Sequence, residues 1–424
     1  MSANFLNESL KAPKPLMGEL NGRKPVRAPA ADLLPKAIYV TTIDFSLRFL
    51  VLGAMKYLRS RGFDVYGVSA PGNLLREVEE AGVPTRTVAL TRQVTPFTDL
   101  RCLIQLVRLF RKEKPTIVHT HTPKANLLGQ LAARIANVPV RICSIHGLYF
   151  TQRTPLLKRL SFQLIEAAST YFAEVVFLSN QDDVDTATSL GICKTEKLRL
   201  LPGGTGVALD HFRPEKLNAE ALRERRAALG LPPDAFVVGF VGRLVREKGL
   251  IELFEAVKQL SAELPNLRLL IIGPCDTAKP DSVSEETARQ YGVADRCVFT
   301  GLRTDLCDLY KVMDVFALPS YREGMPLSTM EAQAMGIPVI TTDARGARES
   351  IVPGTTGIRV PVGDAQALAQ GILTLARDSS LVEKMKLAGR ALAEERFDQR
   401  IMFGLFESEY LRLLHRKGTS YRPT

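Results

Sequence analysis

Short apolar runs of strand character alternate with helix-length segments along most of this 424-residue chain. From Lys36 to Thr205 the runs read AIYV, DVYGVSA, TRTVAL, TIVHT, VRICSI, EVVFLS and KLRLL. The main helix-length stretches are 45–61, 97–113, 123–137 and 155–172. Strands that alternate with helices form parallel sheets whose two faces are both covered. The pattern therefore predicts an α/β domain with a doubly wound parallel sheet.

The alternation breaks at 201–234, where PGGTG and a charged stretch ending in LGLPPD indicate a hinge. It resumes with AFVVGFVG, LRLLIIG, RCVFTG, DVFALPS, IPVITTD and TGIRVPV. We therefore expect two doubly wound, Rossmann-like domains facing a cleft, at 36–205 and 235–395, joined by a linker at 206–234. Ligands bind beyond the carboxyl ends of parallel strands, so the residues that follow strands are the candidates for chemistry.

The two ends of the chain differ from these domains. Residues 1–35 hold five prolines and scattered basic residues without apolar periodicity, which predicts a flexible basic tail. Residues 396–424 read as a charged helix and a tail, and this helix is a candidate to pack back on the N-terminal domain. No signal-peptide core is present, and no apolar run reaches the roughly 18 residues that span a bilayer. We expect a cytoplasmic protein.

The net charge is +11, and all of the excess lies in the first half. Residues 1–205 carry 27 Lys and Arg against 16 Asp and Glu, whereas 206–424 carries 29 of each. The basic half is either a generally solvated surface or a face presented to an anionic partner. Two helical stretches with basic and apolar residues, 97–114 and 155–172, fit an anionic membrane surface and ordinary packed helices equally well. The six cysteines form no CxxC pair, which argues against a zinc ribbon, a redox site or a disulfide framework.

Two cations stand five positions apart where the strand AFVVGFVG turns into a helix, in GRLVREKG at 242–249. A helix N-terminus offers unpaired N–H groups and the positive end of a dipole. Arg243 adds a fork of donors and Lys248 a point charge, a combination that suits a diphosphate. The alternative is a solvated loop with exposed charges. A P-loop is not indicated, because GxxxxGK[ST] is absent.

Two glutamates eight positions apart flank a glycine turn in YREGMPLSTMEAQAMG at 321–336, after the predicted strand DVFALPS. Glu323 precedes the predicted helix, and Pro326 suits its first turn. Glu331 lies within the helix, where a carboxylate can accept hydrogen bonds from two ribose hydroxyls. The segment Gly324, Met325, Pro326 and Leu327 is expected to bind phosphate oxygens through its free N–H groups.

The segments GRLVREKG, FTGLRTDL, LPSYREGMPLSTMEAQAMGIPVITTDARGARESI and GTTGIRVPVGD together resemble the retaining glycosyltransferases of family 4, and the likeness spans nearly all of 36–415. The resemblance implies the GT-B architecture and transfer of a sugar from a nucleotide-sugar donor, expected to be UDP-linked. It implies that Arg243 and Lys248 bind the donor diphosphate and that Glu331 binds the ribose. Glu323 would lie near the donor sugar. The region that cups the nucleobase would include Leu302 and Arg303.

Two N-terminal motifs, IVHTHTPKANLLG (117–129) and RICSIHGLYF (141–150), resemble the family members that extend capsule, O-antigen and other lipid-linked glycans. This likeness implies a polyprenyl-diphosphate-linked saccharide as acceptor. His146 takes the position of a cleft-facing histidine that contacts donor sugar and acceptor; a satisfied structural histidine is the alternative. We expect His119 and His121 to face opposite sides of their strand, with His121 lining the cleft.

Two further residues are acceptor-side candidates. Asp44 follows the first strand, where its carboxylate either meets acceptor hydroxyls or caps the helix that begins near Phe45. Lys124 follows the strand of the two histidines. Asp183 and Asp185 have the DxD spacing of a metal site, but acidic residues at a helix start are explained by the helix dipole. We expect no metal and no cofactor, the nucleotide-sugar being a substrate.

The expected partners are the nucleotide-sugar donor, the lipid-linked saccharide and an anionic membrane surface. The basic N-terminal domain would contact the inner face of the plasma membrane. No nucleic-acid partner is expected, because the basic half shows no recognised binding module. Two other functions stay open: a nucleotide-sugar epimerase of the same architecture, and a non-catalytic anion- or nucleic-acid-binding protein.

Overall fold

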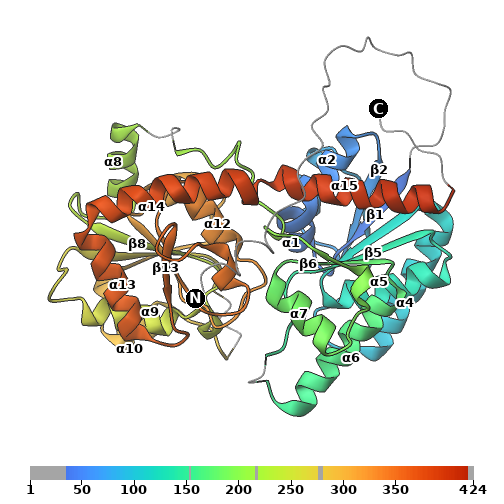
Figure 1. Ribbon diagram of the computed structural model, residues 1–424, viewed down its shortest axis with the longest axis horizontal. Coiled ribbons are helices and arrows are strands. Elements are labelled where there is room, and N and C mark those ends of the chain that lie inside the picture. The colour runs from blue at the N-terminus through green and yellow to red at the C-terminus, as the bar shows by residue number, and fades with distance from the viewer. Residues whose placement is uncertain (1–34, 152–153, 215–217, 276–279, 419–424) are drawn as a thin grey trace, which may run out of the picture. The chain divides into compact units, whose positions relative to one another are not determined.

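The computed structural model describes residues 35–151, 154–214, 218–275 and 280–418. The tail predicted at 1–35 lies outside the described residues except for Pro35. The described chain forms two parallel sheets with helices packed against them (Figure 1), which confirms the predicted fold class. None of the helices in these ranges has both the length and the apolar run that crossing a bilayer requires.

The first sheet has seven parallel strands in the order β3-β2-β1-β4-β5-β6-β7. They are β1 (Lys36–Val40), β2 (Asp64–Ser69), β3 (Thr85–Thr87), β4 (Ile117–His121), β5 (Val140–Ile145), β6 (Val175–Leu178) and β7 (Leu198–Leu200). The central strand β1 pairs with β2 and β4, so that Ala37 stands opposite both Val65 and Ile117. Because every strand runs the same way, all carboxyl ends meet at one edge of the sheet.

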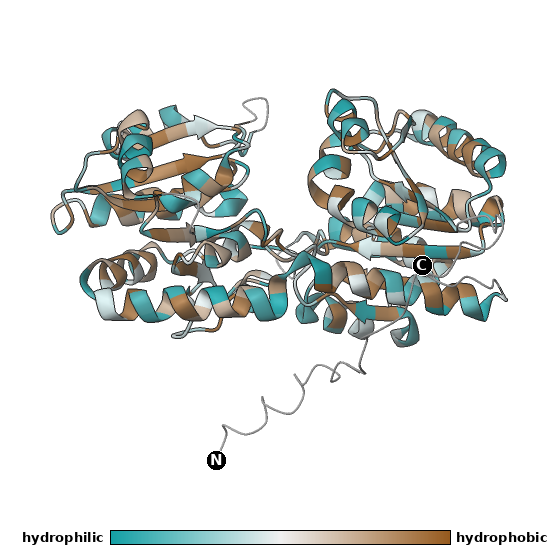
Figure 2. Cartoon of the chain, turned by 90° about the horizontal axis from the view of Figure 1, so that it is seen from above, coloured by the Kyte–Doolittle hydropathy of each residue, from teal (hydrophilic) through white to brown (hydrophobic). Residues whose placement is uncertain are grey.

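Both faces of this sheet are covered because its central strand is apolar on both sides. Ala37 and Tyr39 pack into the cluster that contains α2, whereas Ile38 and Val40 pack with α4 and α5. Figure 2 shows the hydrophobic residues concentrated on the strands and the more polar residues on outer helix surfaces. The helices are α1 (Asp44–Ser46), a π-helical turn (Leu47–Val51), α2 (Leu52–Ser60), α3 (Leu75–Glu80), α4 (Pro96–Glu113), α5 (Pro123–Ile135), α6 (Leu156–Phe172) and α7 (Gln181–Ser189), with a 3-10 turn at Thr195–Lys197.

The second sheet has six parallel strands in the order β10-β9-β8-β11-β12-β13. They are β8 (Phe236–Val241), β9 (Leu267–Ile272), β10 (Cys297–Gly301), β11 (Val315–Leu318), β12 (Val339–Thr342) and β13 (Gly357–Val360). The helices are α9 (Leu250–Gln259), α10 (Glu285–Tyr291), α11 (Leu306–Lys311), α12 (Leu327–Ala334), α13 (Ala365–Arg377) and α14 (Ser379–Leu392). Shorter helical turns lie at Arg246–Lys248, Ala294–Arg296, Ala347–Ser350 and Ala393–Phe397.

Part of the segment expected to be a linker forms a helix, α8 (Ala219–Ala228). The side chain of Asn218 caps it by accepting a hydrogen bond from Ala221 N at 2.8 Å. Arg226 ties the helix to the second sheet, because its Nη2 donates to Asp314 Oδ2 at 3.0 Å. The connection between the sheets is therefore partly ordered by contacts of its own.

The last helix, α15 (Gln399–Arg416), packs on the first sheet although it follows the second in sequence. Figure 1 shows it in red alongside α2. Tyr410 OH donates to Tyr39 OH at 2.8 Å in the core of the N-terminal domain. The apolar residues of α15 that are buried in this core are Met402, Phe403, Phe406, Leu413 and Leu414.

Candidate active site

Lys248 and Glu323 form a close ion pair at the carboxyl edge of the second sheet. Lys248 ends the 3-10 turn after β8, and its Nζ lies 2.6 Å from Glu323 Oε1 and 2.7 Å from Oε2. Ser320 Oγ donates to the same Oε1 at 2.6 Å. The two side chains of the pair are only 16% and 10% exposed. Sequence analysis assigned Lys248 to the diphosphate and Glu323 to the donor sugar, and the structure brings the two together.

Arg243, the other cation of the predicted diphosphate pair, is exposed just after β8. Its side chain forms no hydrogen bond or ion pair with another residue of the described ranges. Gly249 lets the turn approach the loop that follows β11, because a Cβ there would lie 2.0 Å from Pro319 O. Its φ of +75° also favours glycine. The segments that carry Arg243, Lys248 and Glu323 therefore lie against each other.

The loop before α12 presents backbone donors. Pro326 is the N-cap of α12 rather than part of its first turn, since its ψ of 109° is extended, and it has no N–H to offer. The N–H groups of Gly324, Met325 and Leu327 donate to no acceptor within the part of the chain that the structure describes. They lie at the N-terminal end of α12, where the helix dipole favours an anion.

Glu331 lies inside α12 with 6% of its surface exposed. Tyr310 OH donates to its Oε2 at 2.8 Å. Burial raises the pKa of Glu331 to about 8, and the hydrogen bond from Tyr310 offsets part of that rise. Hydroxyl donors such as those of a ribose would stabilise the ionised form and lower this pKa. Sequence reasoning missed Tyr310, because no pattern connects a residue of α11 with one 21 positions later on α12.

Leu302 and Arg303 follow β10 at the same edge of the sheet. Leu302 is 57% exposed, so its apolar surface is open to a flat ring. Arg303 donates through Nε and Nη2 to the two carboxylate oxygens of Asp305, at 2.8 and 2.5 Å. Arg225 on α8 holds the same carboxylate at 2.7 Å. The guanidinium is thereby fixed, and its role toward a nucleobase stays a prediction.

Three histidines cluster at the carboxyl ends of β4 and β5. The ring centroids of His119 and His121 are 4.1 Å apart, so the prediction that they face opposite sides of the strand is wrong. Residues two apart on a strand project from the same face. His121 Nδ1 lies 3.0 Å from His146 Nε2, and the two rings are stacked. His119 is bound instead to Tyr410 OH and Ser144 Oγ, each at 2.7 Å.

The histidine cluster is uncharged at neutral pH. Burial lowers the pKa of His146 to about 4. The pKa values of His119 and His121 are also lowered, first by burial and further by their histidine neighbours. Of the three, only His146 is partly exposed. It can therefore donate a hydrogen bond to a sugar hydroxyl or accept one from it, while the contact with His121 holds its ring in place.

The other two acceptor-side candidates are engaged by the protein. Asp44 Oδ1 accepts from Phe45 N at 2.8 Å, and its Oδ2 accepts from Leu74 N at 3.1 Å. Lys124 Nζ contacts Asp99 Oδ1 at 2.6 Å and three other acceptors in the segment 91–95. An ammonium group has three protons, and all of them are engaged by these contacts. The saccharide substrate could therefore bind Lys124 only if one of these contacts broke. Both assignments stay predictions.

Loops of the first sheet contact the Glu323 loop. A Cβ on Gly324 would lie 1.9 Å from His146 O, so the two backbones touch. Asn180 Nδ2, after β6, donates to Gly324 O at 2.6 Å. Arg345, after β12, donates to two carbonyl oxygens in the loop after β5, at 2.8 and 2.6 Å. These contacts place His146 beside the Glu323 loop. Sequence analysis missed Asn180 and Arg345, whose only signal is that each follows a strand.

Asp183 of the DxD sequence is held by hydrogen bonds and an ion pair within the protein. It is fully buried, and its Oδ2 accepts from Leu148 N at 3.1 Å and from Asn180 Nδ2 at 2.9 Å. Its Oδ1 lies 3.1 Å from Arg345 Nε. Across the described ranges, no three His, Cys, Asp or Glu side chains are grouped so that they could hold a metal ion. The independence of the reaction from metal stays a prediction.

Two protein-family models match the chain, one on each side of the junction between the sheets. The glycosyl transferase 4-like domain matches residues 50–204, and glycosyl transferases group 1 matches residues 223–392. Among solved structures, that of HepE from Anabaena in complex with UDP covers 89% of this chain and 99% of its own, with a TM-score of 0.74 and 22% identity. This likeness concerns the fold.

Full-length relatives are similar along most of the sequence. The capsular polysaccharide biosynthesis glycosyltransferase CapM of Staphylococcus aureus is 32% identical over 88% of this chain and 96% of that protein. The UDP-Gal:alpha-D-GlcNAc-diphosphoundecaprenol alpha-1,3-galactosyltransferase of Escherichia coli is 30% identical over 70% of this chain and 75% of that protein. With the two parallel sheets and both family matches, these similarities show that the chain belongs to the group 1 glycosyltransferases and is an enzyme of GT-B fold.

Proposed function

We propose that this enzyme transfers a sugar from a UDP-linked donor to a polyprenyl-diphosphate-linked saccharide, with retention of configuration, during assembly of a surface polysaccharide. The observation that carries the proposal is the Lys248–Glu323 pair next to the N–H groups of Gly324, Met325 and Leu327, which donate to no acceptor within the described residues. The names of two relatives support the substrate class. The Escherichia coli relative is named for UDP-Gal and a diphosphoundecaprenol acceptor. A Campylobacter jejuni relative, 24% identical, is named for a diphospho-undecaprenol acceptor as well.

Catalysis in this proposal is electrostatic. The acceptor oxygen bonds to the anomeric carbon while the bond from that carbon to the diphosphate breaks, and the electron pair stays on the diphosphate. Arg243, Lys248 and the N–H groups of Gly324, Met325 and Leu327 stabilise the charge that develops there, in place of a metal ion. A phosphate oxygen on the same face takes the acceptor proton, which requires the acceptor to be held close. His146 hydrogen-bonds a sugar hydroxyl in its neutral form.

A thermal-shift panel of UDP-, GDP-, ADP- and TDP-sugars tests the donor. A ligand that binds only the native state raises the unfolding temperature, so UDP-sugars should give a selective shift. Lys248→Ala should remove most of that shift for UDP and leave the response to uridine unchanged. A panel in which no nucleotide-sugar shifts the transition would refute the proposal.

A nucleotide-sugar epimerase of the same architecture makes a different prediction. It would convert the donor to its epimer without any acceptor, whereas the transferase should return the donor sugar unchanged until a lipid-linked saccharide is added. Product analysis by nuclear magnetic resonance with and without the acceptor distinguishes the two functions.

Two exposed stripes in the N-terminal domain support docking on an anionic membrane at the inner face of the plasma membrane. On α4, Phe97, Leu100 and Ile104 are exposed, and Arg108 and Arg111 continue the stripe. On α6 the exposed apolar residues are Leu156, Leu157, Leu160, Leu164 and Tyr171, with 83% of Leu157 accessible. Exposed apolar side chains flanked by cations suit a surface that enters lipid headgroups.

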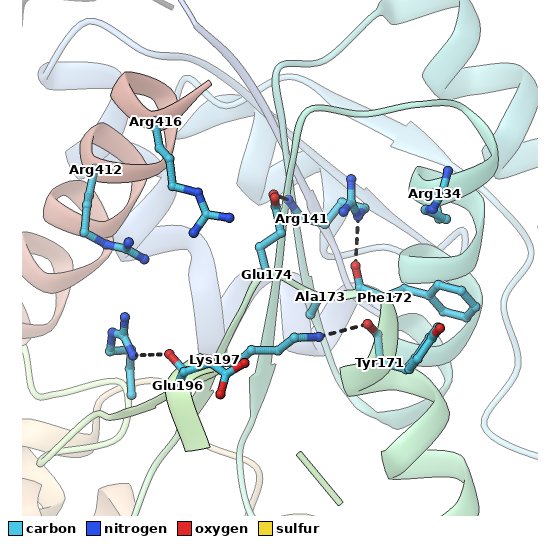
Figure 3. A pocket seen from close by; sticks show the side chains of 11 residues that line it. Arg134, Arg141, Tyr171, Phe172, Ala173, Glu174, Glu196, Lys197, Arg412 and Arg416 are labelled. Atoms are coloured by element: carbon cyan, nitrogen blue, oxygen red, sulfur yellow. Dashed lines mark hydrogen bonds between the residues drawn. The ribbon is translucent and has the colours of Figure 1, made fainter. Parts of the chain in front are cut away.

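A basic pocket of about 420 Å³ lies at the end of α6, where β5, β6 and β7 begin. Figure 3 shows Arg412 and Arg416 extending from α15 toward the side that Glu174 and Lys197 line. Two carboxylates line this pocket, Glu174 and Glu196. The cations that line it are Arg134, Arg141, Lys197, Arg199, Arg412 and Arg416. Burial lowers the pKa of Arg141 and of Lys197, and Glu174 offsets part of this for Arg141. An anionic headgroup would stabilise the charged form of both side chains.

Vesicle sedimentation tests the membrane docking. The protein should bind phosphatidylglycerol vesicles and not phosphatidylcholine vesicles. Arg134→Ala combined with Arg416→Ala, and separately Leu157→Ser, should weaken this binding. Lys384→Ala, which removes an exposed cation from α14 in the other domain, is the matched control and should have no effect. Equal binding of all variants would contradict the assignment of this surface.

A further inference from the structure

A second pocket opens beside His146 in the N-terminal domain. Its volume is about 170 Å³, and its lining includes Thr122, Asn126, His146 and Glu166. These residues come from the end of β4, from α5, from the end of β5 and from α6. The proposed reaction uses only His146 among them. Thr122, Asn126 and Glu166 have no role in that reaction, so the function of this pocket is still to be assigned.

Two residues that line this pocket each carry a buried side-chain oxygen without a hydrogen-bond partner. Glu166 is 3% exposed and Asn126 is 1% exposed. Within the described ranges, Glu166 Oε2 and Asn126 Oδ1 form no hydrogen bond. Asn126 Nδ2 donates to Ser144 O at 3.0 Å, which fixes the amide and leaves its oxygen unsatisfied. Roughly nine in ten buried polar groups in native proteins are paired, so an unpaired oxygen on each of two lining residues is evidence for a polar occupant.

The chemistry of the wall selects an uncharged occupant. Burial, reinforced by the carboxylate of Asp183, raises the pKa of Glu166 to about 8. At neutral pH its carboxyl group therefore donates one hydrogen bond and accepts others, while Asn126 Oδ1 only accepts. A hydroxyl or an acetamido group matches these partners, and a phosphate does not. The volume of 170 Å³ corresponds to roughly five or six waters at about 30 Å³ each, enough for part of one sugar ring.

The position of the pocket assigns it to the acceptor. The residues that we propose to bind the donor follow strands of the second sheet, whereas this pocket is lined by N-terminal residues alone. It shares His146 with the reaction site, and His146 O touches the backbone of Gly324. We propose that Glu166 and Asn126 bind a hydroxyl or acetamido group of the acceptor's terminal sugar and thereby select the acceptor. This inference depends on the proposed function.

Acceptor kinetics test this pocket, with N-acetylglucosaminyl-diphosphoundecaprenol as the probe. Glu166→Leu removes the hydrogen-bonding group, and the acceptor KM should rise about tenfold, as expected for the loss of one hydrogen bond of about 1.4 kcal/mol. The donor KM should not change. Glu166→Gln keeps a donor and an acceptor and should retain the acceptor KM. Glu80→Leu, an exposed glutamate on α3, is the control.

A merely structural Glu166 would lower the unfolding temperature without separating the two KM values, and that outcome overturns the inference. If Glu166→Leu does not fold, Glu166→Ala takes its place.

A binding measurement separates failure of the pocket from failure of the proposed function. Saturation-transfer nuclear magnetic resonance with N-acetylglucosamine should detect contact with the wild-type protein and none with Glu166→Leu. Contact that survives in the variant means that the sugar binds without Glu166, and no contact in either protein means that the pocket holds water only. Either result overturns the inference. Absence of transfer to any lipid-linked acceptor, with sugar contact intact at Glu166, would refute the proposed function and keep the pocket.

Discussion

Replacing Glu331 by Gln should stabilise the empty enzyme and weaken its nucleotide site. The pKa of Glu331 rises from 4.5 to about 8 on folding. The folded state therefore holds a proton that the unfolded state releases between these two values, and stability falls as pH rises through that window. Each pKa unit corresponds to about 1.36 kcal/mol, so the loss reaches about 3 kcal/mol at pH 7. A glutamine cannot ionise and avoids this loss, while it can still accept the hydrogen bond from Tyr310.

Urea unfolding at several pH values measures this effect. Glu331→Gln should exceed the wild type by up to about 3 kcal/mol at pH 7, with the difference shrinking toward pH 4.5. Glu255→Gln makes the same chemical change at an exposed position of α9 and should leave stability unchanged. A Glu331→Gln protein that is no more stable than the wild type at pH 7 would refute the assignment of a neutral buried carboxyl group.

The same substitution should weaken UDP binding about tenfold, because an ionised carboxylate accepts hydrogen bonds from two hydroxyls more strongly than an amide oxygen does. Calorimetric titration with UDP across pH 6 to 9 measures it. Wild-type affinity should rise with pH as Glu331 ionises, and the affinity of Glu331→Gln should lack that rise. Parallel pH profiles for the two proteins would contradict the ribose assignment.

Three other outcomes follow from the contacts described above. Lys248→Ala should lower UDP affinity by at least about tenfold, since it removes a charge-assisted contact to the diphosphate, and should leave uridine affinity within about twofold by calorimetry. Tyr410→Phe leaves the buried His119 Nδ1 without its partner and should lower the free energy of unfolding by about 1 to 3 kcal/mol in urea. Because the pKa of His146 is about 4, the pH–rate profile should show no ionisation of this residue between pH 6 and 8; a step in that range that disappears in His146→Asn would contradict its neutral role.

The sequence predicted the two sheets because strand periodicity and helix length are local properties. It also predicted which segments reach the carboxyl edges, since each follows a strand. Arg243, Lys248 and Glu323 were recognised in this way. Their mutual arrangement was not, because the Lys248–Glu323 contact joins positions 75 residues apart. Local patterns hold no information about such a pair.

The errors have equally physical causes. His119 and His121 were expected on opposite faces although a strand repeats every two residues, and their rings lie 4.1 Å apart. The glycines and charges at 206–234 predicted a linker but not the helix α8 within it, which Arg226 anchors through a distant contact. Glu166 was missed because an isolated glutamate in an amphipathic helix gives no local signal; only the fold shows that it is buried.

Glu166 in the N-terminal domain and Glu331 in the C-terminal domain are both buried carboxyl groups that are protonated at neutral pH. Each is a buried carboxyl group whose pKa is raised to about 8, and each lies near the carboxyl edge of its sheet. In the empty protein both therefore oppose folding above pH 4.5, by the same proton linkage. If these two side chains only filled the core, glutamine or leucine at the same positions would give a more stable protein. Retaining two such acids is consistent with sites kept at a cost in stability, which sugar hydroxyls would offset by supplying the missing hydrogen bonds. The donor and acceptor should therefore each raise the unfolding temperature, and each increase should be smaller in the variant that removes the corresponding acid.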